Sequence, residues 1–262
     1  MQSVASQTFK EFEYIIIDGA STDDSIALVK EYETQFAHLK WVSEPDAGIY
    51  NAMNKGIRMA SGDYIQILNS GDCLATKDVT ELMLAAHDDA GNPSILYGNM
   101  VKCFPDGRKL LDKGFAGQEI TMLGMFTSTL NHDPAFIRRD LFTKYGYYDE
   151  DLKIVSDWKW YIQAIIFGGE KPKYVDLDVT LFDMTGISET NKELEKFERK
   201  QVLEQLLPAT ILEDYQDFAF PMEQIERLKR YPWAYKMVWF LERILFKLEK
   251  TKGKKTLTVK HG

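Results

Sequence analysis

Short apolar runs and amphipathic segments alternate along most of the chain. The runs at residues 14–17, 39–43 and 64–68 are too short for helices and end in polar residues, which is typical of buried strands. Between these runs, apolar residues recur at helical spacing in residues 26–36 and 49–60. Strands that alternate with helices predict an α/β fold, in which helices flank a sheet.

The stretch from residue 43 to residue 72 carries the clearest local signals. Asp46 and Gly48 stand where a helix would begin, and Gly62 stands where it would end. Asp72 follows the next apolar run within a turn. Ligands of open α/β sheets collect at the carboxyl ends of strands, so we expect Asp46 and Asp72 to flank one crevice.

Three motifs in this stretch resemble one protein family. They are Glu-Pro-Asp-Ala-Gly-Ile-Tyr-Asn-Ala-Met-Asn-Lys-Gly at 44–56, Ser-Gly-Asp-Tyr at 61–64 and Leu-Asn-Ser-Gly-Asp at 68–72. The chain is similar to the inverting glycosyltransferases of family 2, in the bacterial branch that builds capsule, O-antigen and exopolysaccharide. The resemblance implies the GT-A fold, a Rossmann-like mixed sheet that binds nucleotide-diphospho-sugars.

The resemblance also divides the chain. It covers residues 1–190, which are predicted to form the catalytic domain, and leaves residues 191–262 as a helical extension. In the family, a first strand that helps to hold the nucleotide base precedes the point where this chain starts. No later segment clearly replaces that strand, so the catalytic domain is expected to lack it.

The resemblance assigns the donor-binding residues to three loops. Asp18 matches the aspartate that hydrogen-bonds the nucleotide base, and Ser21 is a weaker candidate. A carboxylate that accepts from a ring N–H suits uracil or thymine, so a UDP-sugar is the favoured donor. The loop with Glu44 and Asp46 is expected to face the nucleotide. In the helix that follows, Asn54 and Lys55 are candidate partners for Asp46 or for phosphate, although Lys55 is equally interpreted as solvated.

The metal prediction depends on Asp72. The family has two or more acids here, but this chain has Asn69 and Gly71 at the other positions. A leaving nucleoside diphosphate needs a cation, and hard oxygen ligands suit Mg²⁺ or Mn²⁺. Asp72 is therefore the predicted metal ligand, with the capping of the following helix as the alternative.

The predicted catalytic base is Asp157, at the start of a helix where the family carries an acidic pair. Ser156 replaces the first acid of that pair. An inverting transfer needs a carboxylate to take the proton of the acceptor hydroxyl. The alternative is that Asp157 only complements the helix dipole. Trp158 is a candidate for stacking on a sugar, and His132 for a metal ligand, a phosphate contact, a loop anchor or a purely structural residue.

Composition excludes several classes of protein. The net charge of −8 argues against general nucleic-acid binding. The two cysteines, Cys73 and Cys103, have neither metal-type spacing nor a disulfide pattern, which fits a reducing cytosol. No apolar run is long enough to span a membrane, and the first residues do not resemble a signal peptide. A cytoplasmic location is therefore predicted.

The extension carries a different pattern. Apolar residues lie on one helical face, at positions 233, 237, 240, 241, 244, 245 and 248. Basic residues flank this face and follow it in the sequence. An amphipathic, basic, aromatic-rich helix is typical of a peripheral contact with an anionic membrane surface, here the inner face of the cytoplasmic membrane. The alternative is packing on the domain or on a second subunit, as in a homodimer.

The predicted function is the transfer of a sugar, with inversion, from a nucleotide sugar to a glycan or a lipid-linked glycan. A second hypothesis is a non-catalytic nucleotide-sugar binder or a scaffold in a polysaccharide assembly, because one metal acid and the first strand are absent. A nucleotidyltransferase is less favoured, since it would need a glycine-rich phosphate loop near the first strand and the sequence has none.

Overall fold

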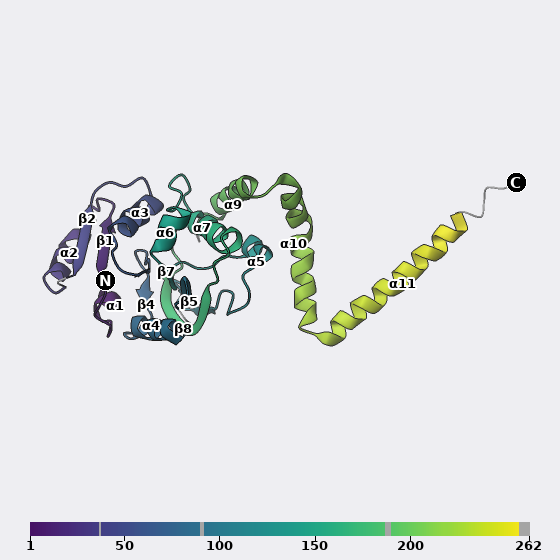
Figure 1. Cartoon of the computed structure of the whole chain (residues 1–262), viewed down its shortest axis with the longest axis horizontal. Coiled ribbons are helices and arrows are strands. Elements are labelled where there is room, and N and C mark those ends of the chain that lie inside the picture. The colour runs from purple at the N-terminus through teal and green to yellow at the C-terminus, as the bar shows by residue number, and fades with distance from the viewer. Residues whose placement is uncertain (37, 90–91, 187–189, 257–262) are drawn as a thin grey trace. The chain divides into compact units, whose positions relative to one another are not determined.

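The computed structural model describes residues 1–36, 38–89, 92–186 and 190–256, and the chain forms two compact units (Figure 1). The first unit is Met1–Leu206 and the second is Leu207–Gly262. The boundary predicted at residue 190 falls before helix α9 (Lys192–Leu206), which belongs to the first unit. The catalytic role of the first unit stays a prediction.

The first unit begins with helix α1 (Gln2–Ala5) and a two-stranded parallel sheet. Strand β1 (Tyr14–Asp18) pairs with β2 (Leu39–Ser43), and helix α2 (Ser25–Glu33) connects the two strands. Helix α3 (Ile49–Met59) then lies against β1, where a Cβ atom on Gly56 would come within 3.5 Å of the side chain of Ile17. These elements match the strands and helices expected from the apolar periodicity.

A six-stranded mixed sheet forms the centre of the first unit. Its order is β3-β7-β5-β8-β4, with β6 on β5. Strands β5 and β8 run parallel, whereas the other pairs are antiparallel. The bounds are β3 (Tyr64–Ile65), β4 (Cys73–Leu74), β5 (Ile95–Cys103), β6 (Lys109–Asp112), β7 (Ala135–Arg138) and β8 (Lys173–Asp183).

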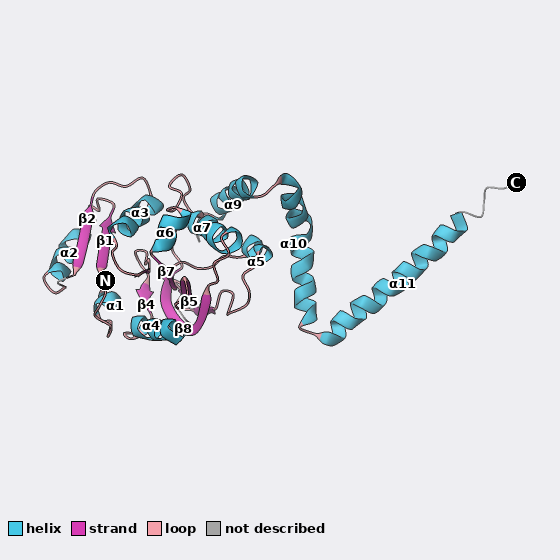
Figure 2. Ribbon diagram, viewed as in Figure 1, coloured by secondary structure: helices cyan, strands magenta, loops and turns pink. Residues whose placement is uncertain are grey.

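Helices cover the central sheet (Figure 2). Leu96 and Phe136 pack with Met83 of helix α4 (Val79–Asp89), whereas the alternate positions Ile95 and Ile137 are buried without belonging to that cluster. This alternation is expected of strands that bury both faces. Other helices in the described part of the unit are α5 (Met122–Thr127), α6 (Asp140–Tyr145), α7 (Ser156–Tyr161) and a π-helix (Ile162–Phe167).

The predicted strand at residues 64–68 is shorter in the structure. Only Tyr64 and Ile65 form strand pairs, and both pair with β7. Residues 66–68 continue beyond the pairs without strand structure. The apolar pattern was correct for burial at Ile65, but a strand also needs a partner for its backbone groups.

Up to residue 256, the second unit consists of two helices, α10 (Ala209–Lys229) and α11 (Pro232–Thr256). The apolar face predicted for α11 is exposed to solvent: Trp233, Phe240 and Leu245 expose 69%, 62% and 61% of their surface. Within the described ranges, no helix is long and apolar enough to cross a membrane.

Candidate active site

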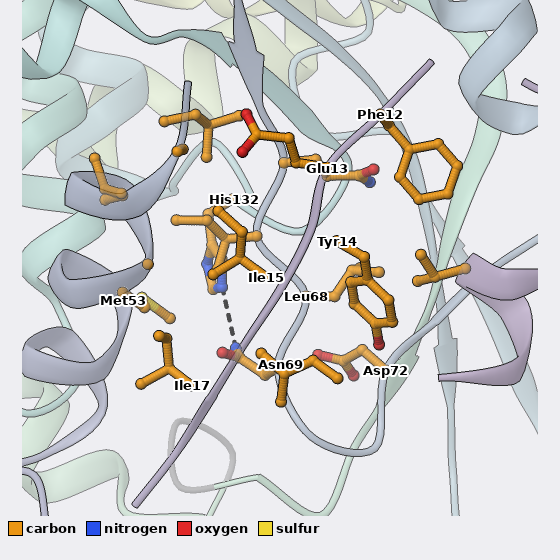
Figure 3. A pocket seen from close by; sticks show the side chains of 18 of the residues that line it. Phe12, Glu13, Tyr14, Ile15, Ile17, Met53, Leu68, Asn69, Asp72 and His132 are labelled. Atoms are coloured by element: carbon orange, nitrogen blue, oxygen red, sulfur yellow. Dashed lines mark hydrogen bonds between the residues drawn. The ribbon is translucent and has the colours of Figure 1, made fainter. Parts of the chain in front are cut away.

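A cavity of about 1760 Å³ lies among β1, α3 and residues 64–72 (Figure 3). Apolar side chains, among them Ile15, Ile17, Met53 and Leu68, line its middle. Polar groups gather where β1 and the 64–68 segment end. They are Asp18, Asp46, Asn69, Asp72 and His132. The expectation that Asp46 and Asp72 flank one crevice is confirmed, since both line this cavity.

Asp18 is held in place by the neighbouring strand and its own turn. Its Oδ2 accepts hydrogen bonds from the backbone N–H of Ser21 at 3.0 Å and from the hydroxyl of Ser43 at 2.7 Å. These bonds from Ser21 and Ser43 lower the pKa of Asp18, so it stays ionised at neutral pH. Asp18 and Ser21 both line the cavity, and Ser21 orients the carboxylate through its N–H.

Asp46 comes close to the Asp18 loop. A Cβ atom on Gly19 would lie 2.5 Å from Asp46 Oδ2, so a larger residue at this position would displace the Asp46 carboxylate. Asp46 Oδ1 accepts from the N–H of Gly48, which fixes the carboxylate ahead of α3. Two carboxylates, Asp18 and Asp46, thus stand side by side at one end of the cavity.

Asp72 lies on the opposite wall. Gly71 has φ +98°, a left-handed conformation that suits glycine, and it brings Asp72 Oδ1 within 2.8 Å of the N–H of Asp183. Burial raises the pKa of Asp72, and the neighbouring Asp133 carboxylate raises it further, to about 8. Asp133 is almost fully buried, and His132 Nε2 lies 3.5 Å from its Oδ1. The two carboxyl groups therefore share His132 as a neighbouring cationic side chain.

His132 connects the cavity to the predicted base. Its Nδ1 lies 3.0 Å from Asp157 Oδ2, and its Nε2 lies 3.1 Å from the amide nitrogen of Asn69, the dashed contact in Figure 3. Burial alone would lower the pKa of His132, but the Asp133, Asp157 and Asp72 carboxylates outweigh burial and raise it to about 9.

Asp157 has a partner on each oxygen. Besides His132, the hydroxyl of Tyr50 lies 2.8 Å from Asp157 Oδ1, and it shares its one hydrogen with the carbonyl of Ile154 at 2.6 Å. Burial would raise the pKa of Asp157, but the hydrogen bonds from His132 and Tyr50 lower it. Asp157 itself is not among the residues that line the cavity, whereas His132 is.

A buried glutamate fixes the start of the Asp157 helix. Glu198 of α9 accepts from the backbone N–H groups of Lys153, Ile154 and Val155, at 2.7, 2.9 and 3.3 Å. These donors directly precede α7, so the Glu198 carboxylate caps the N-terminus of α7 from a distant segment of the chain. No local signal in the sequence predicts this contact, because Glu198 is one of several glutamates in the same helix.

Two predicted site residues make buried structural contacts. Asn54 is buried, donates both amide hydrogens to Tyr148 O and Glu150 Oε1, and accepts from the N–H of Tyr148, so it cannot reach a nucleotide. Trp158 is 1% exposed and donates its indole N–H to Met125 O, so it offers no face to a sugar. The expected contacts of these two residues with the donor and with a sugar stay predictions, and the burial of both side chains does not support them.

Glu44 and Lys55 pair with each other. Lys55 Nζ lies 2.8 Å from Glu44 Oε1 and 3.2 Å from the carbonyl of Pro45, and neither side chain lines the cavity. Their predicted contact with the donor stays a prediction, and the structure favours the alternative in which Lys55 is a partly solvated helix residue.

The sequence reasoning missed Tyr50, Asp133 and Lys153. Tyr50 lies inside the longest motif, which was a usable signal, and Asp133 directly follows His132. Lys153 lines the cavity, and its Nζ lies 3.1 Å from the carbonyl of Ala47. Nothing in the local sequence connects Lys153 with residues 44–48, so only the tertiary structure could find it.

The metal prediction has limited support from the protein side. Within the described ranges, no group of three or more His, Cys, Asp or Glu side chains could hold a metal ion. Asp72 nevertheless fits one ligand position, because its carboxyl group lines the cavity, and burial and the Asp133 charge outweigh the effect of His132 and raise its pKa. A cation here would need further oxygen ligands from the substrate, such as those of a diphosphate.

Solved structures with similar folds place the chain in a class. It matches S. aureus TarS 1-349 in complex with UDP, with a TM-score of 0.57, 20% identity and coverage of 80% of this chain and 70% of TarS 1-349. The complex of the same TarS fragment with UDP-GlcNAc gives a TM-score of 0.61 and 21% identity, covering 82% and 64% of the two chains. The mixed sheet flanked by helices is a GT-A glycosyltransferase fold, as predicted.

Sequence comparison gives the family. The profile "Glycosyl transferase family 2" matches residues 1–146, and the chain belongs to this family. An uncharacterized glycosyltransferase of Mycobacterium tuberculosis is 32% identical over 195 residues, which cover 71% of this chain and 70% of the relative. A PGL/p-HBAD biosynthesis glycosyltransferase of Mycobacterium bovis is 24% identical over 192 residues, covering 72% and 73%.

Proposed function

We propose that the first unit binds a nucleotide sugar, with a UDP-sugar as the favoured donor, and transfers the sugar with inversion to a glycan or a lipid-linked glycan. The observation that carries the proposal is the arrangement of acids around one cavity: two stand on the β1 side, and Asp72 faces them beside the His132–Asp157 pair. The TarS complexes with UDP and UDP-GlcNAc support a donor of this class.

The donor would lie with its base at the β1 side of the cavity. Asp18 stays ionised and keeps free acceptor capacity, so it can accept from a ring N–H of uracil. Lys153, whose ammonium lines the same end, can contact the diphosphate. Asp46 can accept hydrogen bonds from ribose hydroxyls. These roles follow from the chemistry of each group and from their common position.

The diphosphate would extend toward Asp72. Asp72 is the residue that would hold a Mg²⁺ or Mn²⁺ ion together with the diphosphate oxygens, and such an ion would stabilise the charge of the leaving group. Asp72 must lose its proton to act as a ligand, and its raised pKa of about 8 makes that step dependent on pH.

Proton transfer would run through the His132–Asp157 pair. The acceptor oxygen bonds to C1 of the sugar as the bond from C1 to the diphosphate oxygen breaks, and the hydroxyl proton passes to this pair. Asp157 is the base, and His132 is the member of the pair that lines the cavity. Tyr50 holds the other oxygen of Asp157 and limits its rotation.

The test is a donor screen with purified protein and Mn²⁺. Each UDP-sugar is incubated with and without glycan acceptors, and release of UDP is measured. We expect one donor to release UDP in the wild type and not in Asp157→Asn. The second candidate function is a non-catalytic nucleotide-sugar binder, which predicts donor binding in calorimetry and no release of UDP under any condition. This candidate is supported by the single acid, Asp72, at the predicted metal position.

We further propose that α11 binds the cytoplasmic face of an anionic membrane, where a lipid-linked acceptor is presented. Its apolar side chains are exposed, and the basic Arg243 and Lys250 lie over the rings of Trp239 and Phe246, at 4.7 and 4.8 Å. Each basic residue near an anionic surface adds about 1 kcal/mol.

Vesicle co-sedimentation tests the membrane proposal. Binding should need anionic lipid, weaken with salt and disappear on deletion from Tyr231 onward. Sedimentation with neutral vesicles alone, or none at low salt, contradicts it. Dimer formation that depends on α11 would show instead that a second copy covers the apolar face.

A further inference from the structure

Residues 153–157 carry two of the groups to which the proposed function assigns a role. Lys153 lines the cavity, and Asp157 is bonded to His132. The residues from Lys153 up to the start of α7 lie outside helix and strand structure. The positions of both side chains therefore depend on the contacts that hold this short segment.

A single buried side chain of α9 holds the segment. Glu198 is 4% exposed, and its two carboxylate oxygens accept from three successive backbone N–H groups. Oε1 lies 2.7 Å from the nitrogen of Lys153, and Oε2 lies 2.9 and 3.3 Å from those of Ile154 and Val155. Successive N–H groups that converge on one anion form a concave site for it. Glu198 therefore sets the direction of three consecutive peptide groups.

Tyr50 holds the same segment from its carbonyl side. Its hydroxyl lies 2.6 Å from the carbonyl oxygen of Ile154 and 2.8 Å from Asp157 Oδ1. Because the N–H of Ile154 is bonded to Glu198, both backbone groups of this residue have fixed partners. A change in its backbone angles would break at least one of these bonds and redirect the chain between Lys153 and Asp157.

The next residue of α9 contacts the other side of Asp157. The guanidinium of Arg199 lies over the ring of Trp158, 4.5 Å from its centre, and its Nη1 lies 3.4 Å from the carbonyl oxygen of Ser128. Two consecutive side chains of α9 thus contact the residues before and after Asp157. Glu198 is not among the residues that line the cavity, so it acts on a bound ligand through the residues that it holds.

We propose that Glu198 is a positioning residue, an assignment that rests on the proposed function of Lys153 and Asp157. Its carboxylate directs Lys153 toward the diphosphate of the donor and keeps Asp157 beside His132. One carboxylate outside the cavity thereby couples donor binding to the geometry of proton transfer. Glutamine has nearly the same size, but its NH₂ group cannot accept a hydrogen bond. Glu198→Gln therefore loses at least one of the three bonds.

Calorimetry with UDP and with uridine tests the proposal. Lys153 would contact the diphosphate, which uridine lacks, so Glu198→Gln should weaken UDP binding about tenfold and change uridine binding by less than about twofold. Glu204→Gln is the matched control and should bind both ligands as wild type, because Glu204 lies on the same helix with its side chain 53% exposed, 3.8 Å from Lys200. A side chain that only stabilised the fold would not distinguish UDP from uridine, so equal changes for the two ligands overturn the proposal.

A double-mutant cycle identifies the residue through which Glu198 acts on the donor. Lys153→Gln removes the ammonium group, and UDP affinity should fall by a factor similar to that of Glu198→Gln. When Glu198→Gln is added to Lys153→Gln, UDP binding should weaken by less than about threefold, since the contact is already lost. Fully additive losses contradict the proposal.

The transfer rate reports on Asp157. With saturating donor and acceptor, kcat of Glu198→Gln should fall about tenfold, because a small displacement of a reacting group lowers the rate steeply. Glu198→Asp keeps two acceptor oxygens on a shorter side chain and should recover part of both kcat and UDP affinity. A kcat equal to that of wild type in Glu198→Gln overturns the proposal.

Two measurements keep the outcomes separate. Hydrogen exchange at the amides of Ile154 and Val155 should become faster in the folded variants, which shows that the bonds to residue 198 are weakened. Should Glu198→Gln not fold, Glu198→Asp carries the test, and it should weaken the binding of UDP more than that of uridine. Unchanged UDP affinity in the folded variants overturns the role of Glu198 and leaves the proposed function standing. A wild type that binds no UDP contradicts the proposed function, and the role of Glu198 fails with it.

Discussion

The two walls of the cavity carry acids in opposite electrostatic states. On the β1 wall, Asp18 and Asp46 are accessible, and the pKa of Asp18 is lowered by hydrogen bonds from Ser21 and Ser43. On the opposite wall, burial and the Asp133 charge raise the pKa of Asp72, and neighbouring carboxylates raise that of His132. The difference indicates that the first wall contacts a ligand through groups whose charge stays constant. The groups of the second wall, in contrast, change their protonation when the ligand or a cation binds.

The largest expected effect comes from Asp157, which is bonded to His132 of the second wall. Asp157→Asn keeps the size of the side chain but removes its capacity to take a proton, so transfer should fall by about 10²–10⁴-fold. Donor affinity should stay within a few-fold of wild type, because Asp157 does not line the cavity. Asp149→Asn, which changes an acid paired with Lys159 on the surface side, is the matched control. Transfer within a few-fold of wild type would show that Asp157 is not the base.

A smaller effect is expected on the accessible wall. Asp18→Asn removes a charged acceptor and should weaken donor binding by about 1.5–3 kcal/mol, roughly 10- to 100-fold. Calorimetry with the donor and with UDP alone measures this change. Asp23→Asn, in the same loop, is the control, because the Asp23 carboxylate accepts a hydrogen bond from the N–H of Ser25 and does not line the cavity. If both variants bind alike, the base does not lie against Asp18.

Asp72 should control the dependence on metal. Donor binding by the wild type should tighten with Mn²⁺ by roughly tenfold, about 1.4 kcal/mol. The gain should be larger at pH 9 than at pH 6.5, since the ion must displace a proton from Asp72. Asp72→Ala should bind the donor equally in Mn²⁺ and in EDTA, and Asp106→Ala on an exposed turn should behave as wild type. Metal dependence that survives in Asp72→Ala contradicts the assignment.

The smallest effect concerns stability without metal. The pKa values of Asp72 and His132 rise from 3.8 to about 8 and from 6.5 to about 9. A group whose pKa is raised by folding contributes its full stabilisation at pH values below its pKa in the unfolded chain. That contribution is lost as the pH rises through its pKa in the folded protein. The melting temperature should therefore fall between pH 6.5 and pH 9, by roughly a few degrees. His132→Gln should show a shallower fall, and a wild-type curve that rises over this range would contradict the electrostatic interpretation.

The sequence by itself determined the elements and the family. Apolar periodicity located β1, β2 and α3, and the motifs of residues 44–72 identified the family and its GT-A fold. Periodicity and motif spacing are local properties of the chain, so they can be recognised in a single sequence. The placement of Asp46 and Asp72 at one crevice was also predicted from the sequence, because each follows an apolar run that was expected to be a strand.

The tertiary structure alone decided which candidates face the cavity. Asn54 and Trp158 lie on helices at plausible positions, but contacts from residues 148–150 and from Met125 cover them. Lys153 reaches residue 47, and Glu198 holds the start of α7, across long separations in sequence. The burial, the hydrogen-bond partners and the pKa of a side chain depend on groups that the fold brings together from distant segments. The local sequence pattern does not identify those groups.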